Sequence, residues 1–362
     1  MEAVIDVQEK LKEKGQKIIG EFEENGRYVS WQHCNLAFKK CKEKINESNK
    51  ECVIDYLALH LAFYLASWGM YRGSSFLLQY DYKIHERAVE HILNPEYEKL
   101  WDITIENIDK LDKEEIKSKL ASVTEQLMEV YNKYKSTAIK KISQGDGKLD
   151  ERDKELEENI TDTLVTKILL GTFGCVPAYD RYVVSALKRI GIKETKFIKK
   201  HKLNEKAFDA IWEFCIESKT TLKEVYNSFK KLPEGLNHKK YPIMKILDIS
   251  LWQYGIDLEN TIIFMSNGEA PEKYSEDIDR IKKELKEKLY NQIKDKPKDL
   301  RLQKKCNRIE NIEAEYERKS RSITGVQCLL IVTDKDMNMR RKENICNENE
   351  IKNKLEEIFK IK

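Results

Sequence analysis

The stretch from Val53 to Trp68 is apolar along almost its whole length and is interrupted mainly by Asp55 and His60. Its apolar residues fall on every side of a helix and not on a single stripe. Such a helix is stable when other elements cover it all round, so we expect residues 53–68 to form a buried helix. The longest apolar run, Tyr56 to Met70, is too short and too polar to cross a bilayer.

Composition favours helices around this segment. The 362 residues include only 6 Pro and 14 Gly, which argues against collagen-like chains, linker-rich disorder and turn-dense β-sandwiches. Lys, Glu, Leu and Ile dominate, and these residues favour helix. With 40% hydrophobic residues the chain can bury a substantial core. The sequence therefore predicts a mainly all-α fold.

The character of the chain changes near residue 258. Residues 272–322 carry 16 basic and 12 acidic residues and few core-forming positions. Only Gly325 to Thr333 has the composition of a β-strand. We expect a helical domain over residues 1–258 and a charged C-terminal accessory region, α/β or helical, over residues 259–362.

The eight cysteines include no C-x-x-C pair. Because zinc cages usually need such a pair, we expect no metal site, and no other cofactor is indicated. The cysteines are typical of small buried side chains in a reducing compartment. The first residues lack the apolar core of a signal peptide, so we expect a cytoplasmic protein with no membrane partner. The sequence does not indicate an oligomeric state.

The most informative segment runs from Lys167 to Gly191. An apolar helix expected over residues 162–170 leads into Gly171-Thr-Phe-Gly-Cys-Val-Pro-Ala-Tyr179. Asp180 then begins an amphipathic helix that ends in Lys-Arg-Ile-Gly, and Asp is a good N-cap residue. Taken alone, Asp180 is equally well explained as a structural cap.

This pattern resembles the helix-hairpin-helix (HhH-GPD) superfamily of DNA glycosylases, in which an Asp after a Phe-Gly…Pro loop begins a Val-x-x-x-Leu-x-Arg-Leu-Gly helix. The resemblance implies an HhH-glycosylase-like helical domain and gives Asp180 the place of the catalytic aspartate. A carboxylate there stabilises an oxocarbenium-like sugar or orients water. The family's Leu-Pro-Gly-x-Gly hairpin is not found before Asp162. No lyase lysine stands near Asp162 or Thr163, and Lys167 lies too close to Asp180 to align, so the resemblance implies a monofunctional enzyme.

In the same family, the turn after an early buried helix lines the pocket for the flipped base. A flipped base needs an aromatic face and hydrogen-bonding groups. Residues of these types follow the apolar helix, namely Trp68, Tyr71, Arg72, Ser74, Ser75 and Gln79. The alternative is a glycine-kinked core helix with Trp68 and Phe76 buried.

A basic segment follows the Asp180 helix. Residues 188–206 hold eight Lys or Arg and two Glu, although the whole chain carries only +3. Clustered cations beside a candidate catalytic carboxylate favour contacts with a DNA backbone. The residues assigned to phosphates are Arg181, Lys188, Arg189, Lys199, Lys200 and Lys202. An ordinary solvated face is the alternative.

The expected partner is therefore double-stranded DNA. Within the glycosylases, we favour the bacterial anti-phage enzymes that excise glucosylated 5-hydroxymethylcytosine from phage DNA. Two other functions stay open. Arg27 and His33 have the Arg-x(4–6)-His spacing of HEPN ribonucleases, which act as RNA-cleaving toxins. The chain could also be a non-catalytic helical module that binds nucleic acid or protein.

Overall fold

The computed structural model describes most of the N-terminal two thirds of the chain and short segments beyond it. The described residues are 2–20, 27–73, 75–144, 160–199, 201–229, 241–260, 262–266, 280–281, 283–285, 287–288, 312–316, 328–332, 341–345 and 353. Contacts divide the chain into two compact units, Met1–Gly255 and Ile256–Lys362.

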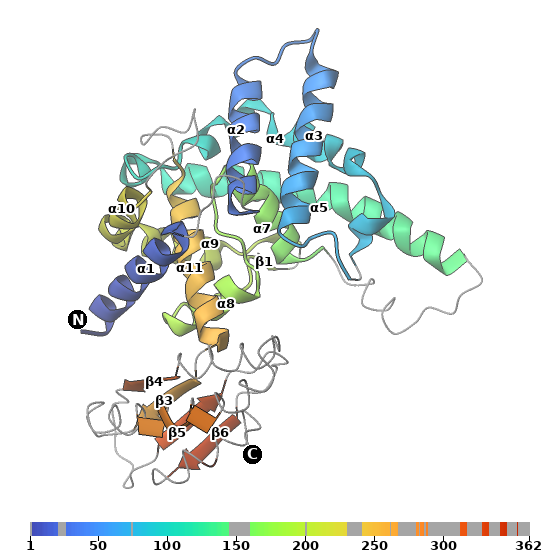
Figure 1. Cartoon of the computed structure of the whole chain (residues 1–362). Helices are drawn as coiled ribbons and strands as arrows, with labels where there is room; N and C mark the ends of the chain where they lie inside the picture. The colour runs from blue at the N-terminus through green and yellow to red at the C-terminus, as the bar shows by residue number, and fades with distance from the viewer. Residues whose placement is uncertain are drawn as a thin grey trace. The chain divides into compact units, whose positions relative to one another are not determined.

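The first unit is helical, which confirms the predicted fold class (Figure 1). The α-helices are α1 (Glu2–Gly20), α2 (Ser30–Lys42), α3 (Lys50–Ser67), α4 (Glu86–Ile92), α5 (Lys113–Gln144), α7 (Asp162–Gly171), α8 (Arg181–Arg189), α9 (Glu205–Glu217), α10 (Lys219–Asn227) and α11 (Ile243–Asn260). Short 3₁₀ helices connect them: η1 (Arg27–Val29), η2 (Phe76–Gln79), η3 (Tyr82–His85), η4 (Pro95–Asp102) and η5 (Ile108–Lys110). A two-stranded antiparallel hairpin, β1 (Ile198–Lys199) and β2 (Lys202–Leu203), precedes α9.

Helix α3 corresponds to the apolar stretch, but it is not covered on all sides. It packs against α2, η3, α4 and α7, and Leu57 and Leu61 are fully buried. Tyr56, Leu59 and Phe63 remain 48%, 52% and 62% exposed. The prediction of a helix buried all round is therefore wrong, because the packing partners cover one side of α3 and leave an apolar stripe on the other.

Two glycines allow the close packing that places the centre of the first unit. At Gly171, the end of α7, a Cβ atom would lie 2.3 Å from the Tyr64 ring of α3. At Gly255 of α11, a Cβ atom would lie 1.9 Å from the carbonyl oxygen of Tyr182 in α8. A side chain at either position would force the helices apart. The start of α8 is thus held directly against α11.

The second unit contains a four-stranded mixed sheet. Its strands are β3 (Ile262–Ser266), β4 (Ile312–Tyr316), β5 (Cys328–Val332) and β6 (Arg341–Ile345), in the order β4-β3-β5-β6. Strand β3 pairs parallel with β4 and antiparallel with β5, and β5 pairs antiparallel with β6. Strand β5 confirms the strand expected within Gly325 to Thr333, but the expectation that only this segment has strand character is wrong, because β3, β4 and β6 join it in one sheet. None of the helices in the described segments has the length and apolar character to span a bilayer.

Candidate active site

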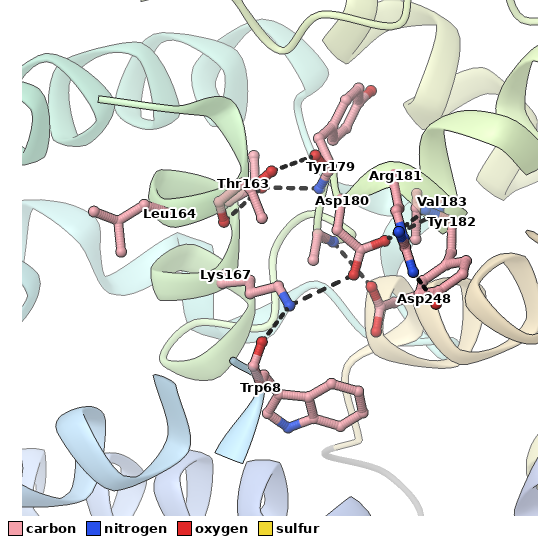
Figure 2. Close-up of polar contacts among 12 residues, drawn as sticks. Trp68, Thr163, Leu164, Lys167, Tyr179, Asp180, Arg181, Tyr182, Val183 and Asp248 are labelled. Carbon is pink, nitrogen blue, oxygen red and sulfur yellow. Dashed lines mark hydrogen bonds and ion pairs between the residues drawn. The ribbon is translucent and has the colours of Figure 1, made fainter. Parts of the chain in front are cut away.

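Asp180 caps α8 with one carboxylate oxygen and faces a buried cation with the other. Its Oδ1 accepts hydrogen bonds from the amides of Tyr182 and Val183 at 3.1 and 3.2 Å, which confirms the predicted N-cap. Its Oδ2 lies 3.5 Å from Lys167 Nζ (Figure 2). The Asp180 side chain is only 13% exposed. A carboxylate held this way has a fixed orientation and one oxygen directed away from the helix it caps.

Lys167 reaches this carboxylate from α7, whose residues from Leu164 to Gly171 are buried. Its Nζ donates a hydrogen bond of 3.1 Å to the carbonyl of Trp68 and lies 5.6 Å from the centre of the Trp68 ring. Sequence reasoning dismissed Lys167 as a misplaced lyase lysine and so missed this contact. A single cation within an otherwise apolar helix was the signal that could have identified it, because a buried charge needs a partner.

Burial and neighbouring charge set the titration of this pair. The pKa of Asp180 is raised above its ordinary value, chiefly because the carboxyl is buried and also because the Asp248 carboxylate lies nearby. The Lys167 ammonium and the capped backbone amides oppose this increase. Burial lowers the pKa of Lys167, while Asp180 opposes that shift. Carboxyls and amines perturbed by both burial and a specific partner are concentrated at functional sites.

A second buried ion pair holds the loop that precedes Asp180. On α11, Lys245 Nζ donates to Asp248 Oδ2 at 2.8 Å, and both side chains are less than one-tenth exposed. Asp248 Oδ1 accepts a 2.9 Å hydrogen bond from the amide of Ala178. The loop that leads into Asp180 is therefore fastened to α11 by a charged acceptor. Sequence reasoning identified neither residue.

The same loop is fastened to α7 and to the β1–β2 hairpin. Thr163 Oγ1 donates to the Tyr179 carbonyl at 3.0 Å, and the Tyr179 amide donates to Thr166 Oγ1 at 2.8 Å. Asp162, the first residue of α7, accepts a 2.8 Å hydrogen bond from the amide of Phe197, just before β1. The Phe197 ring packs 5.1 Å from that of Tyr179. The loop before Asp180 and the residue before β1 are thus both hydrogen-bonded to the first turns of α7.

Aromatic rings lie beside the ion pairs. Trp68 meets Trp252 edge to face with 5.5 Å between ring centres, and Tyr28 packs 6.1 Å from Trp68. Tyr182, two residues after Asp180, lies 5.8 Å from Trp252. Tyr28, Trp68 and Tyr182 are half-buried, whereas Trp252 is buried. Sequence reasoning proposed Trp68 for the pocket but missed Tyr28, Tyr182 and Trp252, which come from three other elements.

The other residues proposed for the base pocket make contacts elsewhere. The Tyr71 hydroxyl shares a 2.7 Å hydrogen bond with His85, which also bonds to Tyr131 at 2.6 Å. Burial lowers the pKa of His85 to about 3, so this imidazole is neutral. The hydroxyl of Ser75 caps η2 by accepting from the Leu77 amide. Arg72 and Gln79 are exposed, and Ser74 lies outside the described residues.

The proposed phosphate contacts lie on α8 and on the hairpin that follows it. Arg181 and Lys188 are exposed, Arg189 is half-buried, and the Arg181 guanidinium lies 4.5 Å from the centre of the Tyr182 ring. Lys199 and Lys202 face each other across the β1–β2 pair and are exposed. Lys202 Nζ approaches Glu125 at 4.0 Å. Lys200 lies outside the described residues.

The structure gives only part of the HEPN pair. His33 is exposed on α2, and the side chain of Arg27 lies outside the described residues. Burial, and then the neighbouring charge of His33, lower the pKa of His60 on α3, so these two imidazoles are neighbours. Within the parts of the chain that the structure describes, no three His, Cys, Asp or Glu side chains form a group that could hold a metal ion.

Comparisons with known proteins give no relative for this chain. No protein-family model, no curated protein and no solved structure matches it.

Proposed function

We propose that this protein is a monofunctional DNA N-glycosylase-like enzyme that flips a modified base out of double-stranded DNA and excises it. The observation that carries the proposal is the buried Asp180–Lys167 pair beside Trp68. Cleavage of an N-glycosidic bond develops positive charge on the sugar, and a fixed carboxylate stabilises that charge most strongly where water is largely excluded. The half-buried aromatic rings next to the pair supply faces on which a base can stack.

In the proposed reaction, the bond between the sugar C1′ and the base nitrogen breaks, and its electron pair leaves with the base. Asp180 stabilises the oxocarbenium-like sugar and accepts a proton from the water whose oxygen adds to C1′. The departing base takes up one proton from solvent and Asp180 later releases the proton it accepted, so the products are the neutral free base and an abasic sugar. Lys167 favours the ionised form of Asp180, since its charge opposes the increase in pKa that burial causes. Arg181, Lys188, Arg189, Lys199 and Lys202 bind phosphates.

The substrate class follows from the resemblance to the anti-phage glycosylases. We propose glucosylated 5-hydroxymethylcytosine in phage DNA as the base that is removed, in defence of a bacterial cell. The test is an abasic-site assay with duplexes that carry this base, unglucosylated 5-hydroxymethylcytosine or cytosine at one position. We expect alkali-labile breaks only in the glucosylated duplex, and much slower formation of these breaks with Asp180→Asn. No break in any duplex would contradict the proposal.

The same preparation separates the other two functions. RNA cleavage that His33→Ala removes and Asp180→Asn leaves intact would support the HEPN-like ribonuclease. Binding of DNA without any product, unaffected by either substitution but lost on charge reversal of Lys199 and Lys202, would support a non-catalytic module.

The basic hairpin gives a prediction about salt dependence. Replacing Lys199 and Lys202 together with Gln removes two candidate phosphate contacts, so the slope of log K against log[salt] should become shallower by about 2. The measurement is DNA binding by fluorescence anisotropy between low and moderate salt. The matched control is Lys99→Gln with Lys223→Gln, since both lysines are similarly exposed and paired with carboxylates on other elements. An equal change of slope in both double variants would contradict the assignment.

Two neighbours of Asp180 should shift the pH dependence of activity in opposite directions. Lys167 lowers and Asp248 raises the pKa of Asp180, and the carboxylate is the active form. Lys167→Met should therefore move the acid limb of kcat/KM to higher pH by about one unit or more, and Asp248→Asn should move it to lower pH. The measurement is a pH profile of single-turnover excision below the melting temperature of each variant. Shifts of the same sign would show that Asp180 is not the titrating group.

A further inference from the structure

Helix α3 carries an apolar seam that the fold of the first unit leaves open. Its exposed residues include Cys52, Tyr56, Leu59, Phe63 and Ala66, which follow one another at steps of four, three, four and three. This alternation is the heptad spacing with which one helix packs against another. Tyr56, Leu59 and Phe63 are 48%, 52% and 62% exposed, far more than large apolar side chains that belong to a core. Contiguous exposed apolar side chains mark interaction surfaces.

The seam lies on the side of α3 opposite its packing partners. Buried residues such as Leu57, Leu61 and Leu65 face α2, α4, η3 and α7, so the helix is already anchored. Helices α2 and α3 run side by side as a pair (Figure 1). An anchored helix with an open heptad seam can receive another helix without any rearrangement of its own unit.

We propose that two copies of this chain associate through this seam, with α3 packed antiparallel against α3 of the second copy. In an antiparallel heptad register, Leu59 of one copy lies opposite Phe63 of the other, and Tyr56 lies opposite Ala66. Each layer therefore pairs a larger side chain with a smaller one, as close packing requires. The seam itself contains no charged residue, so its two-fold pairing brings no like charges together. A surface that complements itself is what a two-fold dimer needs.

The size of the seam predicts a weak dimer. The surface area of an aromatic side chain is about 150–250 Å². Because Tyr56, Leu59 and Phe63 are each about half exposed, together they expose roughly 300 Å² of apolar surface. Stable interfaces bury about 800 Å² per partner. Flanking side chains add to this area, among them Cys52, Ala66 and half-buried His60. The interface nevertheless stays near the low end of the sizes found for specific protein–protein interfaces. We therefore expect dissociation in the micromolar range. The association does not depend on the proposed enzymatic activity.

The test is sedimentation velocity of the full chain from about 1 to 200 μM, a range chosen to bracket weak interfaces. The wild type should shift from monomer to dimer, and Phe63→Glu or Leu59→Glu should hold it monomeric over the whole range. Leu78→Glu is the matched control, because Leu78 is 50% exposed and belongs to η2 instead of α3, and this variant should leave the dimer unchanged. Circular dichroism and melting temperature check that each variant is folded.

Orientation is tested by disulfide trapping in a Cys52→Ser background. Mixed Leu59→Cys and Phe63→Cys chains should cross-link to each other more readily than either does to itself. A wild type that stays monomeric at the highest concentration overturns the proposal, as does a dimer that Phe63→Glu and Leu59→Glu leave intact. Binding of neutral phosphatidylcholine vesicles by a monomeric wild type would assign the seam to a lipid surface and would equally overturn it.

Discussion

Replacing Asp180 with Asn is expected to lower the rate of base excision by roughly 10²–10³-fold while leaving the helical unit folded. Asn caps a helix as well as Asp does, because its side-chain oxygen also accepts hydrogen bonds from the first backbone amides. The substitution therefore keeps the contacts with Tyr182 and Val183 and removes the charge that faces Lys167. Single-turnover excision of the glucosylated base measures the effect.

Two further variants separate the charge of Asp180 from its cap. Asp180→Ala loses the cap as well, so it should melt lower than Asp180→Asn, by an amount that corresponds to about 1 kcal/mol. Asp180→Asn combined with Lys167→Met removes both charges and should be as inactive as Asp180→Asn alone, yet no less stable. If Asp180→Asn excises the base at the wild-type rate, Asp180 is a structural cap and nothing more.

The elements around Asp180 were predictable because their signals are local. The apolar run that becomes α7 and the Asp that caps α8 are each contained in a few consecutive residues, and both form as expected. The same holds for β5, whose β-branched and apolar residues stand out from a charged background. Hydrophobic periodicity and helix capping depend on residues close together in the sequence, so they can be predicted from the sequence alone.

The residues that complete the site were not predictable in the same way, because non-local contacts assemble it. Asp248 reaches the Ala178 amide across 70 residues, and Lys167 meets the Trp68 carbonyl across 99. No periodicity along the chain says which buried lysine will meet which buried aspartate. The exposed stripe on α3 was missed for a related reason: hydropathy shows that a helix is apolar, but only the arrangement of its neighbours shows which side they leave uncovered.

The largest loss of stability is expected from breaking the Lys245–Asp248 pair on α11. Lys245→Met removes the ion-pair partner of the buried Asp248 carboxylate, which still accepts from the Ala178 amide, and removal of one partner of a buried pair costs about 3–5 kcal/mol. In a unit of this size the melting temperature should fall by about 10 °C. Asp248→Asn should cost less, because its amide oxygen still accepts from Ala178 and the Lys245 ammonium keeps its place 5.4 and 5.5 Å from the Trp31 and Trp68 ring centres.

The double variant decides whether the pair itself produces these losses. Lys245→Met with Asp248→Asn leaves no buried charge at this position, so it should melt higher than Lys245→Met alone. The surface pair Lys219–Asp109, at 2.8 Å, is the control, and Lys219→Met should change the melting temperature by no more than about 2 °C because solvent screens that contact. Calorimetry of the four α11 species and the control measures the coupling. Strictly additive losses at Lys245 and Asp248 would mean that the two charges do not stabilise each other, and that the loop before Asp180 is held by the remaining hydrogen bonds to α7.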